Sequence, residues 1–300
     1  MSNSIKISVC VITYNHEKYI RDCLDSIFTQ EIDFPFEVIV ADDYSTDDTR
    51  NIISEYSLKY PDQLKVILHP SNVGVYENYR SAHDLAQGQY VAHCDGDDFW
   101  YKGKLKFQIQ KLDEDDSLVQ CWTCAKIVNE VGQPINIFPS KLARRLYPRI
   151  LSPQDIALSY SLVGQHSTQV YRRIYKPKIS ESQFLDYWVA FNLSLKGNSL
   201  YIPEIFGAYR ITTTPSLTRH QKAKKVAVDL LSEHLGEISR SYPIYKPYVK
   251  ANLATRILLS WLKKHDLAIA IKEYGKMRDV PLRLGLFIKS IYYFLLQKIR

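Results

Sequence analysis

Short apolar runs alternate with amphipathic stretches along the first 115 residues, and this alternation leaves few folds open to the chain. The apolar runs cover residues 5–12, 36–41, 64–68 and 89–94. Helical periodicity follows each run in turn, over about 17–29, 47–60, 75–87 and 102–113. Strands of this length separated by single helices predict a parallel sheet with helices on its faces. Further strands are expected over 118–128, 167–171 and 198–202, with helices near 183–195 and throughout 221–300.

One of these strands ends in a dense acidic cluster. Asp95, Asp97 and Asp98 fall within four positions, directly after the apolar run 89–94. Like charges this close repel one another, and a divalent cation with phosphate on its other side would offset them. An acidic turn exposed to water is the alternative explanation of the same pattern.

Two more strands are expected to end in polar residues. Thr13-Tyr14-Asn15 follows the first apolar run, and Asp42-Asp43 follows the second. In an open α/β sheet, ligands bind at the carboxyl ends of the strands. We therefore expect these residues and the acidic cluster to form one polar rim.

In order and spacing, four motifs resemble those of the family 2 inverting glycosyltransferases of the bacterial surface-polysaccharide type. The motifs are Ile7-Ser-Val-Cys-Val-Ile-Thr-Tyr-Asn15, Val38-Ile-Val-Ala-Asp-Asp-Tyr-Ser-Thr-Asp47, Asn72-Val-Gly74 and Asp95-Gly-Asp-Asp98. The resemblance is strong from residue 5 to about 130, weaker to about 215 and not visible beyond 220. It implies the GT-A fold, a Rossmann-like, mostly parallel sheet flanked by helices. The expected domains are 1–220, with a nucleotide-sugar half over 1–100 and an acceptor half over 101–220, and a helical C-terminal extension over 221–300.

The resemblance also implies how the donor is held. Thr13, Tyr14 and Asn15 would line the nucleoside pocket, with Tyr14 packed on the base. An ordinary aromatic residue at the rim is the alternative for Tyr14. Asp43 would accept a hydrogen bond from the imide N–H of the base, which favours uracil or thymine, and a UDP-sugar is the expected donor. Asp95 would contact the ribose.

The resemblance also implies a metal ligand and a general base. Asp97 would ligate Mn²⁺ or Mg²⁺, with Asp98 as a second candidate because some relatives place the ligand one position later. In Gln183-Phe-Leu-Asp-Tyr-Trp188, Asp186 would be the general base that takes the proton of the acceptor hydroxyl. Leu185 departs from the Glu or Gly usual in the family, and an Asp that stabilises a helix N-terminus is the alternative.

Four more residues are candidates for contact with the acceptor or the diphosphate. They are His166, Trp188, Arg210 and Arg219. A structural histidine, a core aromatic residue and a solvated basic loop are the competing explanations. A processive synthase is disfavoured because Gln169-Val-Tyr-Arg172 is followed by Arg173 and not by the Trp of the Q-x-x-R-W motif. A nucleotide-sugar-binding module without catalytic activity remains the alternative function.

Charge and composition suggest the partners. The formal net charge of +7 favours anionic phosphates or lipid headgroups, and nucleic acid is not expected. Residues 281–300 are basic, aromatic and apolar, which suits a membrane interface, a buried helix or a dimer contact. A glycan or lipid-linked oligosaccharide is the expected acceptor. No secretory signal is visible, and five Cys fit a reducing cytoplasm, so the protein is expected there or on the inner face of the membrane.

Overall fold

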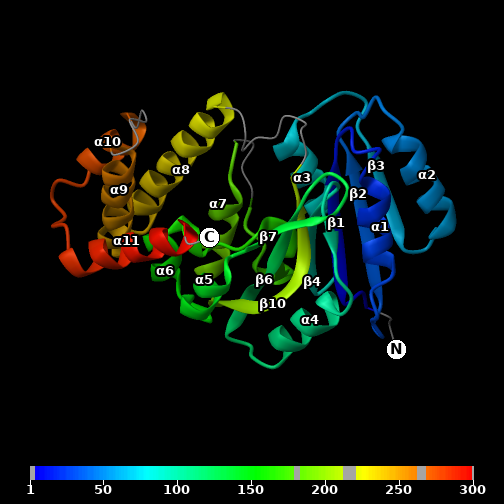
Figure 1. Cartoon of the computed structure of the whole chain (residues 1–300), viewed down its shortest axis with the longest axis horizontal. Coiled ribbons are helices and arrows are strands. Elements are labelled where there is room, and N and C mark those ends of the chain that lie inside the picture. The colour runs from blue at the N-terminus through cyan, green and yellow to red at the C-terminus, as the bar shows by residue number, and fades with distance from the viewer. Residues whose placement is uncertain (1–3, 179–182, 212–220, 262–267, 299–300) are drawn as a thin grey trace. The chain divides into compact units, whose positions relative to one another are not determined.

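The computed structural model describes residues 4–178, 183–211, 221–261 and 268–298, and these residues form two compact units (Figure 1). The first unit is built from residues within 1–139, 164–182 and 199–211. The second is built from residues within 140–163, 183–198 and 212–300. The expected division at residue 220 stays a prediction about domains, since the compact units are assembled from different segments.

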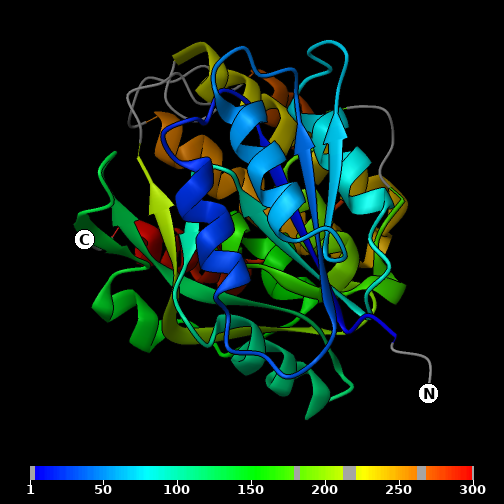
Figure 2. The ribbon, with the colours of Figure 1, turned by 90° about the vertical axis from the view of Figure 1, so that its right-hand side faces the viewer.

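The first unit contains the parallel strands expected from the sequence. They are β1 (Ile7–Thr13), β2 (Phe36–Asp42), β3 (Leu64–Leu68) and β4 (Tyr90–Asp95), in the order β3-β2-β1-β4. The connecting helices are α1 (Ile20–Phe28), α2 (Thr49–Lys59) and α3 (Val75–Asp84). In Figure 1, α1 and α2 lie to the right of these strands and α3 to the left, and Figure 2 shows α1 and α2 together in front of the sheet. Every residue of β1 is buried because the strand is central and both of its faces are covered.

Beyond β4 the same sheet becomes antiparallel. It continues through β9 (Val170–Arg172), β6 (Leu118–Val128), β10 (Asn198–Arg210) and β5 (Phe99–Trp100), with β7 (Pro134–Phe138) beside β6. Helix α4 (Lys104–Asp113) precedes β6. The strand expected over 167–171 was misplaced, because His166–Thr168 forms a 3-10 turn in which Thr168 N–H donates to the Gln165 carbonyl. The short strand expected over 198–202 extends to Arg210.

Apolar side chains from both parts of the sheet form the core of this unit. It includes Val9, Val11, Leu24, Val38, Val40, Ile109, Leu112 and Val170. Cys121 and Cys124 lie buried on β6 as free thiols.

The second unit is mainly helical. Its elements are α5 (Lys141–Leu146), β8 (Ile150–Leu151), α6 (Pro153–Leu158), α7 (Asp186–Ser194), α8 (Gln221–Ser241), α9 (Lys246–Trp261), α10 (Ala268–Gly275) and α11 (Leu284–Lys298), with 3-10 turns at Tyr160–Leu162 and Pro243–Tyr245. Helices α8, α9 and α10 pack on one another, and α11 packs on α9, α6 and α5. The helical prediction for the C-terminal residues is therefore confirmed. Among the described helices, none combines the length and the apolar character needed to cross a membrane.

Candidate functional site

The carboxyl ends of β1, β2 and β4 lie side by side in the first unit. The register pairs Thr13 of β1 with Asp42 of β2, and Ile12 of β1 with Asp95 of β4. Strand pairing therefore brings the three polar strand ends to one edge of the sheet, as the sequence predicted.

Hydrogen bonds lock the loops after β1 and β2 together. Asn15 donates its backbone N–H to Ser45 Oγ at 2.9 Å, and its side-chain Oδ1 accepts from Thr46 N at 2.8 Å. Asn15 and Tyr44 both have positive φ, 53° and 64°, a conformation that Asn tolerates more easily than most residues. Asp42 accepts from Ser45 N at 3.0 Å and from Arg50 Nε at 2.6 Å. Asn15 and Asp42 thus shape this edge of the sheet.

Asp43 is held by the Asn72-Val-Gly74 motif. Its carboxylate is buried and accepts from Val73 N at 2.6 Å and Gly74 N at 3.0 Å. Gly74 has φ 87°, a conformation that residues with a side chain rarely adopt. The motif therefore orients Asp43, which explains why the two motifs occur together.

Two tyrosines expose their rings on the loops of this edge. Tyr14 is 45% exposed and Tyr44 is 44% exposed. Tyr44 was not predicted from the sequence as a site residue, although it follows Asp43 directly. The guanidinium of Arg50 lies 5.2 Å from the centre of the Tyr44 ring and holds that ring in place.

Asp95 is fixed from two sides. His93 Nε2 lies 3.0 Å from Asp95 Oδ1, and Ser167 Oγ donates to Oδ2 at 3.2 Å. Burial alone would raise the pKa of Asp95, but the hydrogen bond and the charge of His93 lower it below its usual value. Asp95 is therefore a carboxylate anion at neutral pH.

Asp97 and Asp98 are neighbours in very different surroundings. Asp98 is fully buried and accepts from Ser167 Oγ at 2.5 Å and from Arg210 N at 2.8 Å. Burial, with Asp97 and Asp95 nearby, raises the pKa of Asp98 well above its usual value. Burial also raises the pKa of Asp97, and among the described residues no other residue donates a hydrogen bond to its carboxylate.

The Asp97 carboxylate fits a metal ion. It is a half-buried oxygen ligand that no other described residue hydrogen-bonds, next to Asp95, and hard cations take such oxygens. Gly96 brings this loop close to β1, since a Cβ at this position would lie 2.8 Å from Thr13 Cβ and 2.9 Å from His16 Nδ1. Any side chain at position 96 would therefore push the loop away from the other strand ends.

Arg210 supports the acidic loop through hydrogen bonds from its guanidinium. Its guanidinium donates to the Asp97 carbonyl at 2.8 Å, the Glu130 carbonyl at 2.6 Å and the Asp22 carboxylate at 2.8 Å. The side chain is almost completely buried. A diphosphate contact by Arg210 stays a prediction, while the structure shows that this residue positions Asp97.

A chain of buried histidines leads away from Asp95. His93 Nδ1 lies 3.0 Å from His83 Nε2, and His83 Nδ1 lies 2.9 Å from the Tyr171 hydroxyl. His166 stacks on His93 with ring centres 4.0 Å apart, and burial lowers the pKa of His166 to about 3. His93, Asp95 and His166 could also hold a metal ion, since their ligand atoms lie within 4.8 Å of one another. However, the nitrogen lone pairs of the stacked rings lie in two nearly parallel planes, and both ring nitrogens of His93 already contact His83 and Asp95, so this cluster suits one ion less well than Asp97 does.

The remaining predicted residues belong to the second unit. Asp186 is the first residue of α7, is half-buried, and accepts from Tyr187 N at 2.9 Å and the Tyr160 hydroxyl at 3.1 Å. Trp188 is half-buried, with its ring centre 6.3 Å from that of His234. Arg219 lies outside the described residues.

Sequence reasoning missed Ser167 and the histidine chain. Ser167 joins Asp95 to Asp98 through its hydroxyl, and it directly follows His166, which was predicted as a site residue. His93 was read as part of an apolar strand. The sequence did hold a signal, because His93 is a titratable residue in a buried strand, two positions before the acidic cluster.

The site can now be compared with known proteins. The family model for glycosyl transferase family 2 matches residues 8–172, more than half of the chain. The chain belongs to glycosyltransferase family 2. This membership confirms the resemblance drawn from the four motifs.

Three curated relatives illustrate the range of the family. An uncharacterized protein of Mycobacterium tuberculosis is 35% identical over 68% of this chain and 58% of its own length. The putative teichuronic acid biosynthesis glycosyltransferase TuaG of Bacillus subtilis is 30% identical over 73% of this chain and 84% of its own length. The GalNAc(5)-diNAcBac-PP-undecaprenol beta-1,3-glucosyltransferase of Campylobacter jejuni is 24% identical over 96% of this chain and 86% of its own length. The chain thus spans little more than half the length of the mycobacterial relative.

Two solved structures share the fold. A fragment of Staphylococcus aureus TarS in complex with UDP-GlcNAc covers 97% of this chain and 84% of that chain, with a TM-score of 0.62 and 23% identity. The mannosyltransferase PcManGT of Pyrobaculum calidifontis, in complex with GDP-Man and Mn²⁺, covers 98% and 86%, with a TM-score of 0.58 and 17% identity. These matches confirm the expected α/β fold of the GT-A type with a helical C-terminal region.

Proposed function

We propose that this protein is an inverting glycosyltransferase that moves a hexosyl group from a UDP-sugar to a glycan or lipid-linked oligosaccharide in surface polysaccharide synthesis. One observation carries the proposal. The oriented carboxylate of Asp43 and the acidic loop of Asp95 and Asp97 follow strands of one parallel sheet, at its carboxyl edge. A nucleoside diphosphate needs both an acceptor for its base and a charge-compensated place for its phosphates.

The nucleoside would be recognised by the loops after β1 and β2. Each carboxylate oxygen has two lone pairs, so the backbone donors on Asp43 leave it able to accept the imide N–H of uracil. Tyr14 would pack on the base, and Thr13 and Asn15 would line the pocket. The ribose would contact Asp95, whose lowered pKa keeps it a hydrogen-bond acceptor.

Asp97 would hold Mn²⁺ or Mg²⁺, with Asp98 buried behind it as a hydrogen-bonded support. When bound, such an ion neutralises the negative charge that develops on the diphosphate leaving group. Arg210 keeps the peptide of Asp97 in place through the Asp97 carbonyl. The binding of Mn²⁺ in PcManGT supports an ion of this kind.

The transfer step needs a base, and we assign this role to Asp186. The oxygen of an acceptor hydroxyl forms a bond to the anomeric carbon on the face opposite the diphosphate. The bond from that carbon to the diphosphate oxygen breaks, and the hydroxyl proton passes to the Asp186 carboxylate. The Tyr160 hydroxyl and Tyr187 N hold this carboxylate in one orientation. His166, Trp188 and Arg219 stay candidates for acceptor or diphosphate contacts.

The acceptor class rests on the relatives. A lipid-linked acceptor is named for the Campylobacter glucosyltransferase, which aligns with almost the whole chain. We place the reaction in the cytoplasm, where nucleotide-sugars are made. A nucleotide-sugar-binding module without transfer activity is the second candidate, and retention of Asp43, Asp97 and Asp186 together argues against it.

The variant Asp186→Asn separates these possibilities. The amide keeps the shape of the side chain but cannot accept the proton, so transfer should fall by about 10²–10⁴-fold. Affinity for UDP with Mn²⁺, measured by calorimetry, should stay at the wild-type value. The matched control is Asp279→Asn, an exposed carboxylate of the same unit. Transfer by Asp186→Asn at the wild-type rate would remove Asp186 as the base, and a wild-type protein that binds but never releases UDP from any sugar nucleotide would support the binding module.

A further inference from the structure

Helices α5 and α11 of the second unit form a surface with exposed apolar side chains. On α11, these side chains are spaced at helical intervals along one side, at Leu284, Ile288, Tyr292 and Leu295. The opposite side of α11 is buried, at Ser290, Tyr293 and Leu296. Helix α5 and the strand after it add Leu142, Leu146 and Ile150, which are also exposed. We call these seven residues and the basic side chains among them the α5–α11 face.

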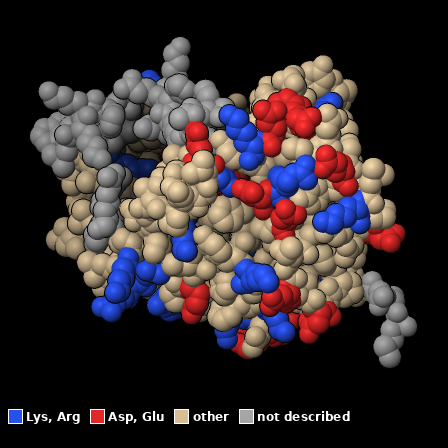
Figure 3. Space-filling view, turned by 45° about the vertical axis from the view of Figure 1, so that its right-hand side comes forward, with Lys and Arg blue, Asp and Glu red and all other residues tan. Residues whose placement is uncertain are grey.

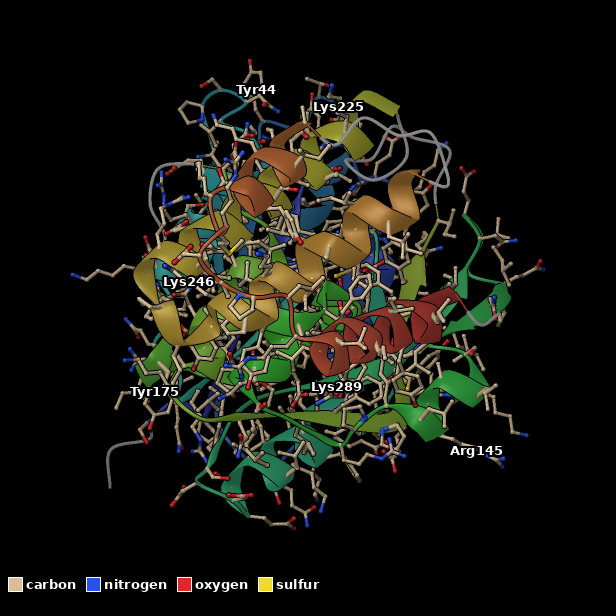
Figure 4. All side chains as sticks on the ribbon, turned by 90° about the vertical axis from the view of Figure 1, so that its left-hand side faces the viewer. Tyr44, Arg145, Tyr175, Lys225, Lys246 and Lys289 are labelled. Atoms are coloured by element: carbon tan, nitrogen blue, oxygen red, sulfur yellow. The ribbon has the colours of Figure 1, made fainter. Side chains whose placement is uncertain are left out.

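The two helices lie against each other although they are far apart in the sequence. Contacts join α11 to α5 directly. In Figure 4, Arg145 marks α5 and Lys289 marks α11, whereas Lys246 and Lys225 belong to α9 and α8, away from this pair. The sequence alone pointed only to residues 281–300, so the contribution of α5 comes from the fold.

The charge of the protein is concentrated in the segments that carry this face. Residues 140–152 and 281–298 contain seven Lys and Arg and no Asp or Glu. The rest of the chain then has 32 basic and 32 acidic residues, so these two segments account for the whole net charge of +7. Figure 3 shows the contrast on the face that carries α1 and α2, where acidic and basic side chains are interspersed. Lys289 of this face is paired with an acid of a neighbouring helix, Asp155 on α6, at 2.9 Å.

An apolar face rimmed with positive charge suits an anionic bilayer. Helices that lie in a membrane interface bury an apolar side and place Lys and Arg among the headgroups, and binding grows with both contributions. A second copy of the chain fits less well. A symmetric dimer would place the same basic face against itself, and like charges would repel across the interface.

We propose that the α5–α11 face docks the protein on an anionic membrane surface without crossing it. This inference does not depend on the donor site and would stand if the transfer activity failed. It gives the second unit a role in bringing a lipid-linked substrate within reach. The exposed leucines enter the headgroup region, and the arginines of α5 contact lipid phosphates.

Co-sedimentation of the full chain with vesicles tests the proposal. Vesicles of phosphatidylcholine with phosphatidylglycerol should bind the protein at low salt, and vesicles of phosphatidylcholine alone should bind it much less. Arg145→Glu with Arg149→Glu should lower binding to the anionic vesicles roughly tenfold or more, because each basic residue near such a surface contributes to binding. The matched control is Lys225→Glu with Lys246→Glu.

A second pair of variants tests the apolar side chains of the α5–α11 face. Leu146→Ser, Ile288→Ser and Leu295→Ser together should also weaken vesicle binding, while Ile244→Ser with Ile271→Ser should not. All five side chains are exposed, so the melting temperature and UDP affinity should stay unchanged and show that the fold is intact.

Four results would overturn the proposal. The wild-type protein could remain in the supernatant with anionic vesicles, or both face variants could bind as well as their controls. Soluble glycerol phosphate could compete as strongly as the same concentration of lipid phosphate, which would mean that the face recognises free phosphate. Analytical ultracentrifugation could reveal a dimer that the apolar variant breaks, without any vesicle binding, and the face would then be a contact between copies of this chain.

Discussion

Two partly buried carboxylates, Asp97 in the first unit and Asp155 in the second, differ in their hydrogen-bond donors and in the direction of their pKa shifts. Asp155 accepts from Ser152 Oγ at 2.7 Å, Lys289 Nζ at 2.9 Å and the Tyr293 hydroxyl at 2.9 Å. Burial alone would raise its pKa, but these hydrogen bonds lower it. Asp97 has no such donors, and burial raises its pKa.

The difference distinguishes a charge that supports the fold from one that we propose binds a metal ion. A buried ion stabilises a protein only when partners replace the water it has lost. Asp155 closes the capping box of α6 and ties that helix to α11, so its partners are all inside the protein. Asp97 is instead held through its backbone by Arg210, which leaves its carboxylate to a partner from outside.

The largest effect is expected from Asp97→Ala. Without this carboxylate the diphosphate loses its ion, and transfer should fall by about 10³-fold, the upper end for loss of one electrostatic contact in a site. Calorimetry should show UDP binding that no longer depends on Mn²⁺, at an unchanged or higher melting temperature. The control is Asp116→Ala, a fully exposed carboxylate of the same unit. Metal-dependent binding equal to that of the wild type would mean that Asp97 is not the ligand.

A smaller effect, on stability and not on ligand binding, is expected from Asp155→Ala. The variant loses a helix cap and two hydrogen bonds between α6 and α11, which should lower the free energy of unfolding by about 2–3 kcal/mol. UDP affinity should not change. Because folding lowers the pKa of Asp155, its stabilisation is present above the usual Asp pKa and is lost as pH falls through the folded value.

Urea unfolding at several pH values checks this result, with Asp279→Ala as the exposed control. The wild-type and variant stabilities should converge in acid. A variant as stable as the wild type at pH 7 would show that Asp155 does not stabilise the fold. A variant that loses UDP binding would show that its role is not only structural.

The smallest effect is expected at Lys104, which extends the comparison to a buried cation. Its amine is buried and makes no hydrogen bond to any described residue. It lies 3.9 Å from the centre of the Trp100 ring, and burial lowers its pKa to about 7. Lys104→Met should raise the free energy of unfolding at pH 7 by about 1–2 kcal/mol, because it removes the cost of burying this charge.

The pH dependence distinguishes this cause from better packing. In the wild type the cost is greatest below about pH 7 and falls between about pH 7 and the usual Lys pKa of about 10.5, since only the unfolded chain is still protonated there. The advantage of Lys104→Met should therefore shrink as pH rises through this range. The exposed control, Lys102→Met, should show neither effect. An advantage that is constant with pH would assign the gain to packing alone.

Much of the first unit follows from local sequence. The strands β1 to β4 and their helices lie within a few residues of their predicted positions, because hydrophobic periodicity is a property of neighbouring residues. The acidic strand end of Asp95 and Asp97 was likewise expected from the sequence, whereas the contact of Asp43 with the Asn72-Val-Gly74 motif was seen only in the fold. The local prediction failed at His166–Thr168, where a turn replaces a strand.

The sequence by itself determined the α/β fold and the edge of the sheet at which the polar strand ends meet. Only the tertiary structure decided how two adjacent aspartates differ. Asp98 accepts hydrogen bonds from the hydroxyl of Ser167, 69 positions later, and from the backbone N–H of Arg210, 112 positions later, whereas no other described residue donates one to the Asp97 carboxylate. The α5–α11 face has the same origin, since helices more than a hundred residues apart supply it. Charge compensation and surface patches depend on which distant residues become neighbours, and no local pattern encodes that.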